Sequence, residues 1–181
     1  MKLIILDRDG VINQDRDDYV KSSLEWVEIP KSADAIAFLN QMGYTIAVAT
    51  NQSGLKRGLF SIHDLNLMHE KMLQTVQNVG GVIFGIWFCP HLPDDDCNCR
   101  KPKPGMIVDI LERFHAVAEE TYLVGDSLRD LQTIAEVGGI PVLVLTGKGK
   151  NTLEKHQELL PANTQIFDSL WDFSQSIDIK T

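Results

Sequence analysis

Two aspartates, Asp7 and Asp9, stand two positions apart where a short apolar segment ends, and Gly10 follows them. Carboxylates this close repel each other unless a cation or a proton lies between them. A third carboxylate, Asp126, follows another apolar segment much later in the chain. Three carboxylates brought together would form the all-oxygen environment that suits magnesium. Each of them alone would more simply be a loop residue in a turn or a cap.

These residue types also suit phosphoryl transfer. A carboxylate can attack phosphorus and form an aspartyl-phosphate, which divides one difficult displacement into two easier ones. A second carboxylate can protonate the leaving oxygen and then activate a water molecule. The reaction further needs cations and hydrogen-bond donors around the phosphoryl oxygens. Thr50 offers a hydroxyl group and Lys101 an ammonium group for that purpose.

The three cysteines of the chain, Cys89, Cys97 and Cys99, lie within one segment of eleven residues that also contains His91. Three thiolates and one imidazole match the closed tetrahedral ligand set of a structural zinc site, with no position left for water. The alternative is three reduced, buried cysteines beside an incidental histidine. Three consecutive aspartates at 94–96 make this segment a polar loop and disfavour that alternative. The spacing therefore predicts structural Zn²⁺.

The cysteine segment leads directly into a basic segment that starts with Arg100 and Lys101. A bound zinc would fix how far these two side chains reach into a neighbouring site. Pro102 and Pro104 stiffen the backbone further. Lys103 is explained equally well as part of a solvated turn that balances the aspartates.

Short apolar segments alternate with longer segments of helical periodicity, which is typical of an α/β fold with a mostly parallel sheet. The expected strands are residues 2–6, 45–49, 82–88, 122–124 and 142–145. The expected helices are 32–42 with Ser32 as its N-cap, a long one beginning at Ser61 with Asp64 in a capping box, one after Gly105, and 128–137, 153–160 and 170–176. Histidines on these helices, His69 included, are expected at the surface or its boundary.

In an open parallel sheet, ligands bind beyond the carboxyl ends of the strands, where the strand order reverses. The polar residues that follow each apolar segment should therefore meet at one edge. We expect that edge to gather Asp7, Asp9, Thr50, Asn51 and Asp126.

Three segments in order along the chain, at 7–11, 50–51 and 125–126, resemble the motifs of the haloacid dehalogenase-like (HAD) phosphohydrolases. The resemblance implies that Asp7 is the nucleophile and Asp9 the general acid and base. It also implies that Thr50 and Lys101 stabilise the phosphoryl group. Catalytic Mg²⁺ would then be bound by Asp7, by the backbone carbonyl of Asp9, and by Asp126.

The same resemblance implies a three-layer, Rossmann-like α/β fold in one domain that spans residues 1–181. A cap domain is not expected. A zinc loop at 89–105, inserted after the third strand, would instead cover the substrate.

Four segments, at 50–54, 89–91, 97–102 and 103–106, closely resemble the HAD subgroup that acts on heptose bisphosphates in lipopolysaccharide-core synthesis. The implied partner is a small phosphorylated sugar, and Arg100 is suited to a bidentate grip on its distal phosphate. Many relatives carry lysine where this chain has Ser127. The implied substrate contacts are Asp15, Arg16, Asp17, Asp18, Thr50, Asn51, Gln52, Ser53, Arg100 and Lys101.

Histidinol-phosphate phosphatases are the nearest alternative, because they share the catalytic set and the zinc loop. A polynucleotide 3′-phosphatase is less compatible with the charge. A catalytically silent, zinc-bearing interaction module is the alternative from another class. A binding scaffold, however, has no need for five residues as specific as Asp7, Asp9, Thr50, Lys101 and Asp126.

The composition agrees with a small enzyme. The chain has 181 residues, with 17 basic against 25 acidic side chains and a net charge of −8. This balance disfavours nucleic-acid binding, which relies on clustered Lys and Arg. The first apolar segment is stopped at Asp7, well short of the roughly 20 apolar residues of a membrane span. We therefore expect a cytoplasmic protein without a membrane partner, and a monomer, because no long amphipathic face is left over.

Overall fold

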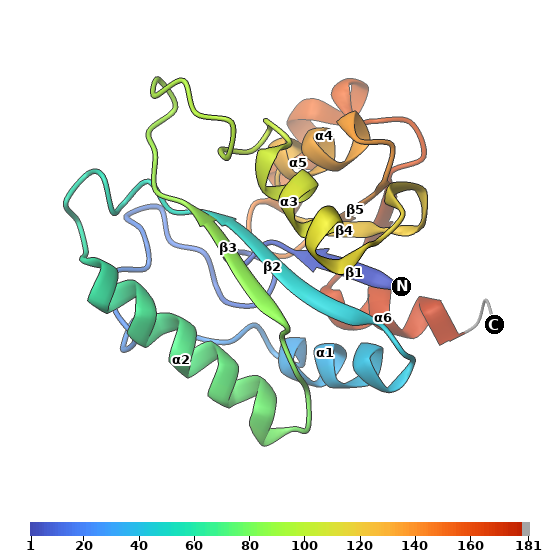
Figure 1. The fold of residues 1–181 in the computed structure, drawn as a ribbon, viewed down its shortest axis with the longest axis horizontal. Coiled ribbons are helices and arrows are strands. Elements are labelled where there is room, and N and C mark those ends of the chain that lie inside the picture. The colour runs from blue at the N-terminus through green and yellow to red at the C-terminus, as the bar shows by residue number, and fades with distance from the viewer. Residues whose placement is uncertain (179–181) are drawn as a thin grey trace.

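The computed structural model describes residues 1–178 and contains one wholly parallel six-stranded sheet (Figure 1). The last three residues of the domain expected over 1–181 lie outside the described part. The strand order is β3-β2-β1-β4-β5-β6. The strands are β1 (Leu3–Leu6), β2 (Thr45–Asn51), β3 (Gly85–Cys89), β4 (Tyr122–Gly125), β5 (Ile140–Val144) and β6 (Gln165–Phe167).

Helices cover both faces of the sheet, so the three-layer α/β arrangement is confirmed (Figure 1). One face carries α1 (Ser32–Gln41), α2 (Ile62–Asn78) and α6 (Leu170–Asp178). The other carries α3 (Gly105–Phe114), α4 (Leu128–Glu136) and α5 (Gly149–His156). Two short 3₁₀ turns complete the described elements, at Ala118–Glu120 and Gln157–Leu159. No helix within residues 1–178 is long and apolar enough to cross a membrane.

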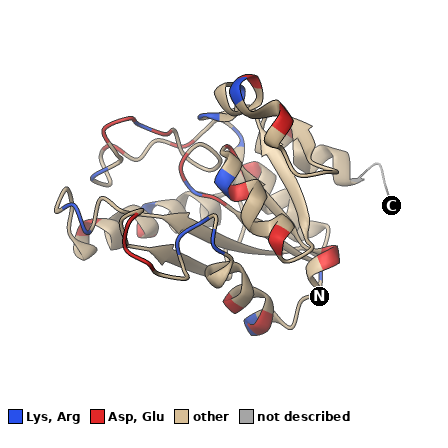
Figure 2. Cartoon of the chain, turned by 90° about the horizontal axis from the view of Figure 1, so that it is seen from above, with Lys and Arg blue, Asp and Glu red and all other residues tan. Residues whose placement is uncertain are grey.

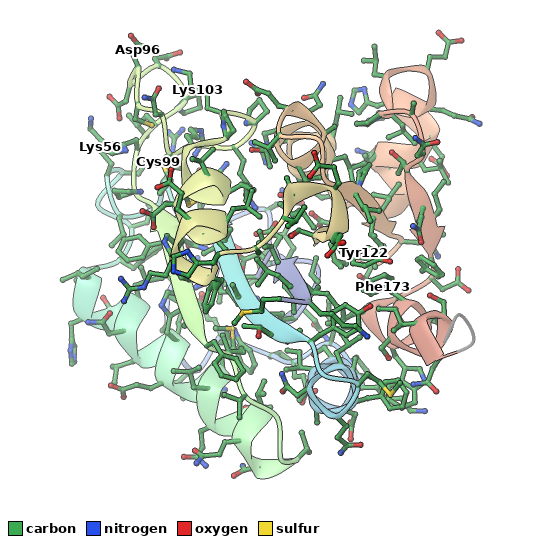
Figure 3. The ribbon with its side chains drawn as sticks, turned by 45° about the vertical axis from the view of Figure 1, so that its right-hand side comes forward. Lys56, Asp96, Cys99, Lys103, Tyr122 and Phe173 are labelled. Carbon is green, nitrogen blue, oxygen red and sulfur yellow. The ribbon has the colours of Figure 1, made fainter. Side chains whose placement is uncertain are left out.

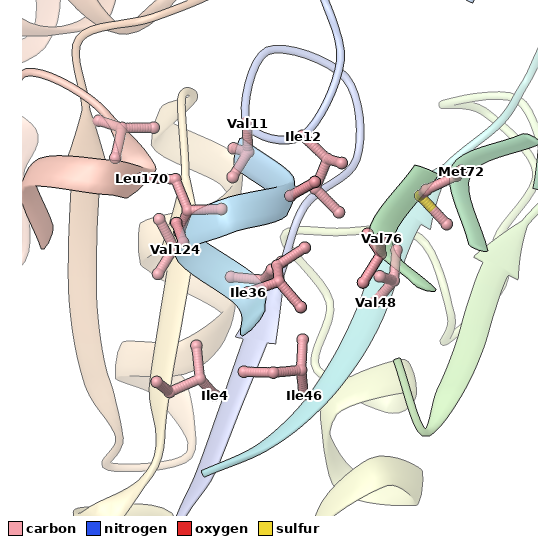
Figure 4. Packing of buried hydrophobic residues seen from close by; sticks show 14 of the residues in the cluster. Ile4, Val11, Ile12, Ile36, Ile46, Val48, Met72, Val76, Val124 and Leu170 are labelled. Carbon is pink, nitrogen blue, oxygen red and sulfur yellow. The ribbon is translucent and has the colours of Figure 1, made fainter. Parts of the chain in front are cut away.

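The central strand β1 is completely buried, because each of its four residues packs against a helical layer. Ile4 and Leu6 join the core beneath α1, α2 and α6, whereas Leu3 and Ile5 join the core on the α3 and α4 side. Figure 4 shows the first of these cores, where Ile36 of α1 lies among residues from several strands. A strand buried on both faces must be apolar throughout, which is why its polar residues begin only at its end.

The sequence placed five strands and all six helices, with different ends for several of them. The strand β6 was missed, because it is a three-residue edge strand without an apolar pattern. Helix α5 starts at Gly149, four residues before the expected start. The capping box of Ser61 and Asp64 on α2 is confirmed. Ser32 is not an N-cap; it is the first helical residue, and its hydroxyl donates to the carbonyl of Ile12 (2.7 Å).

The strand order reverses at β1, which pairs with β2 on one side and β4 on the other. The carboxyl ends of these three strands lie at one edge of the sheet. Thr50 and Asn51, expected after the second strand, are its last two residues. The fold therefore brings the ends of β1, β2 and β4 together at the position where open parallel sheets bind ligands.

Candidate active site

A cavity of about 230 Å³ opens at the carboxyl ends of β1, β2 and β4. Nine of the ten expected substrate contacts line it. Asp18 is not among them; its carboxylate pairs with Arg16 (3.0 Å) and Lys21 (2.8 Å) on the surface. The nine are Asp15, Arg16, Asp17, Thr50, Asn51, Gln52, Ser53, Arg100 and Lys101.

Asp7 lies at the centre of a buried group of charges in this cavity. The ammonium group of Lys101 is 3.0 Å from Asp7 and 2.6 Å from Asp130, and it also donates to the carbonyl of Ala49 (2.7 Å). Lys101 is only 2% exposed. Because water is excluded, the protein itself supplies the positive charge that this pair of carboxylates needs.

Carboxylate oxygens of Asp7, Asp126 and Asp130, called the oxygen cluster below, lie within 4.8 Å of one another. Burial and, to a smaller extent, the negative charge of Asp130 raise the pKa of Asp7 to about 7 against the opposing effect of Lys101. Burial and the same like-charged neighbours also raise the pKa of Asp126. Hard divalent cations favour such oxygen donors and would offset this repulsion, so the cluster fits a magnesium-type ion.

Asp126 is held by the segment before α5. Its carboxylate accepts a hydrogen bond from the backbone N–H of Lys148 (2.8 Å), and its carbonyl accepts one from the hydroxyl of Thr152 (2.8 Å). Gly10 has a φ of +83°, and a side chain there would come within 2.0 Å of the Asp126 carboxylate. Only glycine allows the loop after β1 to approach Asp126 this closely.

Asp130 was not predicted from the sequence. It is the third residue of α4, and its carboxylate accepts hydrogen bonds from the hydroxyl (2.6 Å) and the N–H (3.1 Å) of Ser127 in a capping box. The sequence did contain a signal for this residue, because Asp130 follows Asp126 by four positions at the start of an expected helix. Ser127 thus holds Asp130 in place.

The carboxylate of Asp9 is not part of the oxygen cluster and is held by three side chains. Arg8 donates to both of its oxygens (2.9 and 3.0 Å), Asn13 donates to one (2.9 Å) and Gln52 to the other (2.8 Å). Burial opposes ionisation here, but Arg8 and these hydrogen bonds together lower the pKa of Asp9. Its absence from the oxygen cluster is compatible with a metal contact through its backbone carbonyl alone.

Two of the cavity residues expected to contact the substrate, Asn51 and Gln52, also make structural contacts. The side chain of Asn51 forms two hydrogen bonds with the backbone of Lys101, one to its carbonyl and one from its N–H, each 3.1 Å long. The amide of Gln52, which is 3% exposed, bridges Asp9 (2.8 Å) and the hydroxyl of Thr50 (2.9 Å). These two side chains therefore fix the positions of Lys101, Asp9 and Thr50.

The second group of ligands, called the sulfur cluster below, consists of Cys89, His91, Cys97 and Cys99. One ligand atom from each lies within 4.8 Å of the others. The sulfur of Cys99 is 3.1 Å from that of Cys89 and 3.3 Å from Nδ1 of His91. Burial raises the pKa of the Cys89 thiol to about 12, so a metal must displace its proton. The donor set and the spacing fit a tetrahedral zinc ion.

The loop that carries the sulfur cluster is tied to its surroundings by ion pairs. Lys56, from the loop after β2, contacts Asp95 (2.6 Å), and Lys103 contacts Asp96 (2.9 Å). Figure 3 shows Lys56, Asp96, Cys99 and Lys103 in this region of the molecule. The carbonyl of His91 accepts a hydrogen bond from the guanidinium of Arg100 (3.1 Å), which links the cluster directly to a cavity residue.

Arg129 of α4 also lines the cavity and was not predicted from the sequence. Burial lowers the pKa of Arg100, and the positive charge of the nearby Arg129 contributes to this lowering. Both also line a second hollow of about 240 Å³ beside the cysteine loop. Figure 2 shows basic residues interspersed with acidic ones on the loops at this end. Neighbouring guanidinium groups are suited to bind an anion with more than one oxygen.

Comparisons with known proteins identify the family. The chain is 66% identical over 177 residues to the D-glycero-beta-D-manno-heptose-1,7-bisphosphate 7-phosphatase of Neisseria meningitidis serogroup A, and the match covers 98% of this chain and 95% of that protein. The Pseudomonas putida protein of the same name is 52% identical, with 94% and 95% covered. The chain belongs to this heptose-bisphosphate phosphatase family.

The family model described as HAD-hydrolase-like matches residues 98–173 of this chain. A crystal structure of the D,D-heptose 1,7-bisphosphate phosphatase from B. bronchiseptica, complexed with magnesium and phosphate, superposes with a TM-score of 0.96 at 49% identity and covers all of both chains. The predicted resemblance to HAD phosphohydrolases is therefore confirmed, together with the Rossmann-like HAD fold.

Proposed function

We propose that this chain hydrolyses the phosphate on carbon 7 of D-glycero-β-D-manno-heptose 1,7-bisphosphate and leaves the heptose 1-phosphate. The names of its relatives support this substrate and its β anomer. The reaction would then serve the synthesis of nucleotide-activated heptose and of the lipopolysaccharide core. The observation that carries the proposal is the buried contact of Lys101 with Asp7 in a cavity lined by Arg100 and Arg129.

In the proposed reaction, a carboxylate oxygen of Asp7 attacks the phosphorus of the 7-phosphate. The bond from phosphorus to the sugar oxygen breaks, and Asp9, which enters this step in its protonated form, donates the proton that this oxygen needs. Asp9 then accepts a proton from water as the water attacks the phosphorus of the aspartyl-phosphate, which restores Asp7 and releases phosphate. Lys101 and Thr50 stabilise the phosphoryl oxygens during both steps.

We propose magnesium as the metal of the oxygen cluster. Asp7 and Asp126, with the backbone carbonyl of Asp9, would hold it, and Asp130 lies close enough to support it. A bound magnesium ion supplies positive charge that offsets the negative charge of the phosphoryl group in the transition state. Lys101, 3.0 Å from Asp7, contributes charge of the same sign.

We propose zinc as the metal of the sulfur cluster, in a structural role. Its four ligands leave no open position for water, and the cluster is tied to the cavity through Arg100. The zinc would therefore hold Arg100 and Lys101 in position without contacting the substrate. Both a cytoplasmic location and a monomeric state stay predictions.

The distal phosphate of the substrate is proposed to bind between Arg100 and Arg129. This assignment extends the expectation from sequence, which named Arg100 alone. Arg129 would then provide the positive charge that relatives place at position 127, where this chain has a serine. Four of the other lining residues, Asp15, Arg16, Asp17 and Ser53, are proposed to contact the sugar hydroxyl groups.

The names of the relatives favour the heptose bisphosphate over the alternatives weighed from sequence: histidinol phosphate, a polynucleotide 3′-phosphate and a catalytically silent module. The decisive measurement compares kcat/KM for the heptose bisphosphate, the heptose 7-phosphate and histidinol phosphate. We expect the bisphosphate to be the best substrate by at least about tenfold. A preference for histidinol phosphate would overturn the proposal.

The same measurement on Arg129→Gln tests the distal subsite. Its kcat/KM should fall about tenfold or more for the bisphosphate and change little for the 7-phosphate, which has no distal phosphate. Arg113→Gln, on α3, is a matched control. Equal losses on both substrates would exclude Arg129 from distal phosphate binding.

A further inference from the structure

His69 lies on α2 and is 8% exposed, although it was expected nearer the surface. Its ring packs against Phe88, with 6.3 Å between the ring centroids. Its Nε2 atom is 3.4 Å from Nη1 of Arg8. The family motifs do not explain this contact, because α2 contributes no residue to them.

The direction of this hydrogen bond follows from the chemistry of the two groups. A guanidinium group has only N–H donors, so Nε2 of His69 must accept. The imidazole is therefore neutral, with its proton on Nδ1. Burial and the positive charge of Arg8 lower the pKa of His69 to about 4, which keeps the ring neutral at neutral pH.

Arg8 is completely buried and uses its guanidinium group on two partners. Nη1 donates to His69, while Nη2 donates to both oxygens of Asp9 and Nε contacts one of them (3.3 Å). A long, flexible arginine side chain holds a carboxylate in one orientation only when the rest of its guanidinium group is also bound. His69 provides that fixed contact, because α2 is anchored by Leu65 and Met68 in the core.

We propose that His69 is a positioning residue for proton transfer, which acts through Arg8 to hold the carboxylate of Asp9 in place. The inference rests on the proposed role of Asp9 as general acid and base. Of His69, Arg8 and Asp9, Asp9 alone lines the cavity in the described structure, and the other two lie buried behind it. A proton donor displaced by a fraction of an ångström loses much of its effect.

The test uses substrates whose leaving groups need different amounts of protonation. A sugar phosphate releases an alkoxide and depends on the acid, whereas 4-nitrophenyl phosphate releases a stable phenolate and depends on it far less. His69→Leu should lower kcat/KM for the sugar phosphate about 10- to 100-fold. The loss on 4-nitrophenyl phosphate should be about threefold or less, because formation of the aspartyl-phosphate then needs little acid catalysis.

His69→Gln keeps a hydrogen-bond acceptor for Arg8 and should recover most of the activity on the sugar phosphate. His63→Leu, at an exposed position of the same helix, is the matched control and should behave like the wild type. Equal losses of His69→Leu on both substrates, or no recovery in His69→Gln, would overturn the proposal. If the wild type hydrolysed neither substrate, the proposed function would fail instead.

One measurement does not depend on activity. Nitrogen NMR of the histidine rings should show His69 as a neutral imidazole with its proton on Nδ1 at pH 7. The signal should be absent from the spectrum of His69→Gln, which assigns it. A proton on Nε2 would exclude the hydrogen bond from Arg8 and with it the proposal, whatever the substrate.

Discussion

The oxygen cluster takes its three carboxylates from two segments far apart in the sequence, at Asp7 and at Asp126 and Asp130, whereas one segment of eleven residues supplies all four ligands of the sulfur cluster. The oxygen cluster therefore depends on the strand order, which brings β1 beside β4. The four ligands of the sulfur cluster are close in sequence, so a single segment can bring them together around a metal. Its existence could be predicted from spacing alone, but the oxygen cluster had to be assembled by the fold.

The two clusters also differ in what balances their charge. Lys101 contacts two carboxylates of the oxygen cluster, so that site keeps a counter-charge when no metal is bound. In the sulfur cluster, burial raises the pKa of Cys89, and only a metal compensates for the loss of its proton. We expect loss of magnesium to stop the reaction with the fold intact, and loss of zinc to disorder the loop.

The largest expected effect comes from the oxygen cluster. Asp7→Asn removes the nucleophile and should lower kcat by about 10⁴-fold or more, because no other group can form the covalent intermediate. The circular dichroism spectrum should not change. Asp34→Asn, an exposed aspartate on α1, should keep full activity. Substantial turnover by Asp7→Asn would remove Asp7 from the proposed mechanism.

Lys101→Met tests whether the positive charge of Lys101 is needed for catalysis or only for folding. We expect kcat to fall about 10²- to 10³-fold, because a donor to the phosphoryl oxygens is lost. The metal-free variant should also unfold at a lower temperature, since Asp7 and Asp130 lose their buried partner. Thermal unfolding with and without magnesium separates the two effects. A normal kcat would limit Lys101 to a structural role.

Cys97→Ser tests the loop. It should lower the zinc content from about one ion per chain and reduce kcat/KM about 10- to 100-fold, because Arg100 and Lys101 lose their support. Elemental analysis and steady-state kinetics measure the two results. Asp94→Asn, an exposed change in the same loop, is the control. A zinc-free protein with full stability and activity would contradict the proposed structural role of zinc.

The smallest effect is a pH dependence of stability. The pKa of Asp7 is raised from 3.8 to about 7, so the folded, metal-free protein binds more protons than the unfolded chain between these values. The contribution of Asp7 to stability therefore falls as pH rises from about 4 to about 7. Asp7→Asn should gain stability relative to the wild type over that range, measured by urea unfolding in EDTA. Parallel curves would contradict the raised pKa.

The sequence predicted most residues of the site, because each follows a strand or belongs to a dense cluster of ligands. It missed Asp130, whose carboxylate reaches Lys101 only because α4 begins directly after β4. It also missed His69, although this residue is four positions after the buried Leu65 and therefore faces the same side of α2. The orientations of α4 and α2 decide where the side chains of Asp130 and His69 point. Motifs at the ends of strands contain no information on the orientation of a helix.

The resemblance also could not separate substrate contacts from supporting contacts. Gln52 was expected to bind the substrate, yet its amide bonds to Asp9 and Thr50. Asn51 bonds to the backbone of Lys101 in a segment fifty residues later in the chain. A motif shows that a residue is needed, but which atoms it touches depends on side-chain directions that only the three-dimensional structure provides.

The position of β1 between β2 and β4 has a consequence for synthesis of the protein. Asp7, the proposed nucleophile, leaves the ribosome well before β4, so the nascent chain has Asp7 and Thr50 beside an open edge of β1 and lacks Asp126 and Asp130. The proposed mechanism therefore requires β4 to pair with that edge before the chain becomes active. In a chain cleaved in the exposed turn between α3 and β4, phosphate release would directly report how many fragment pairs had reassembled.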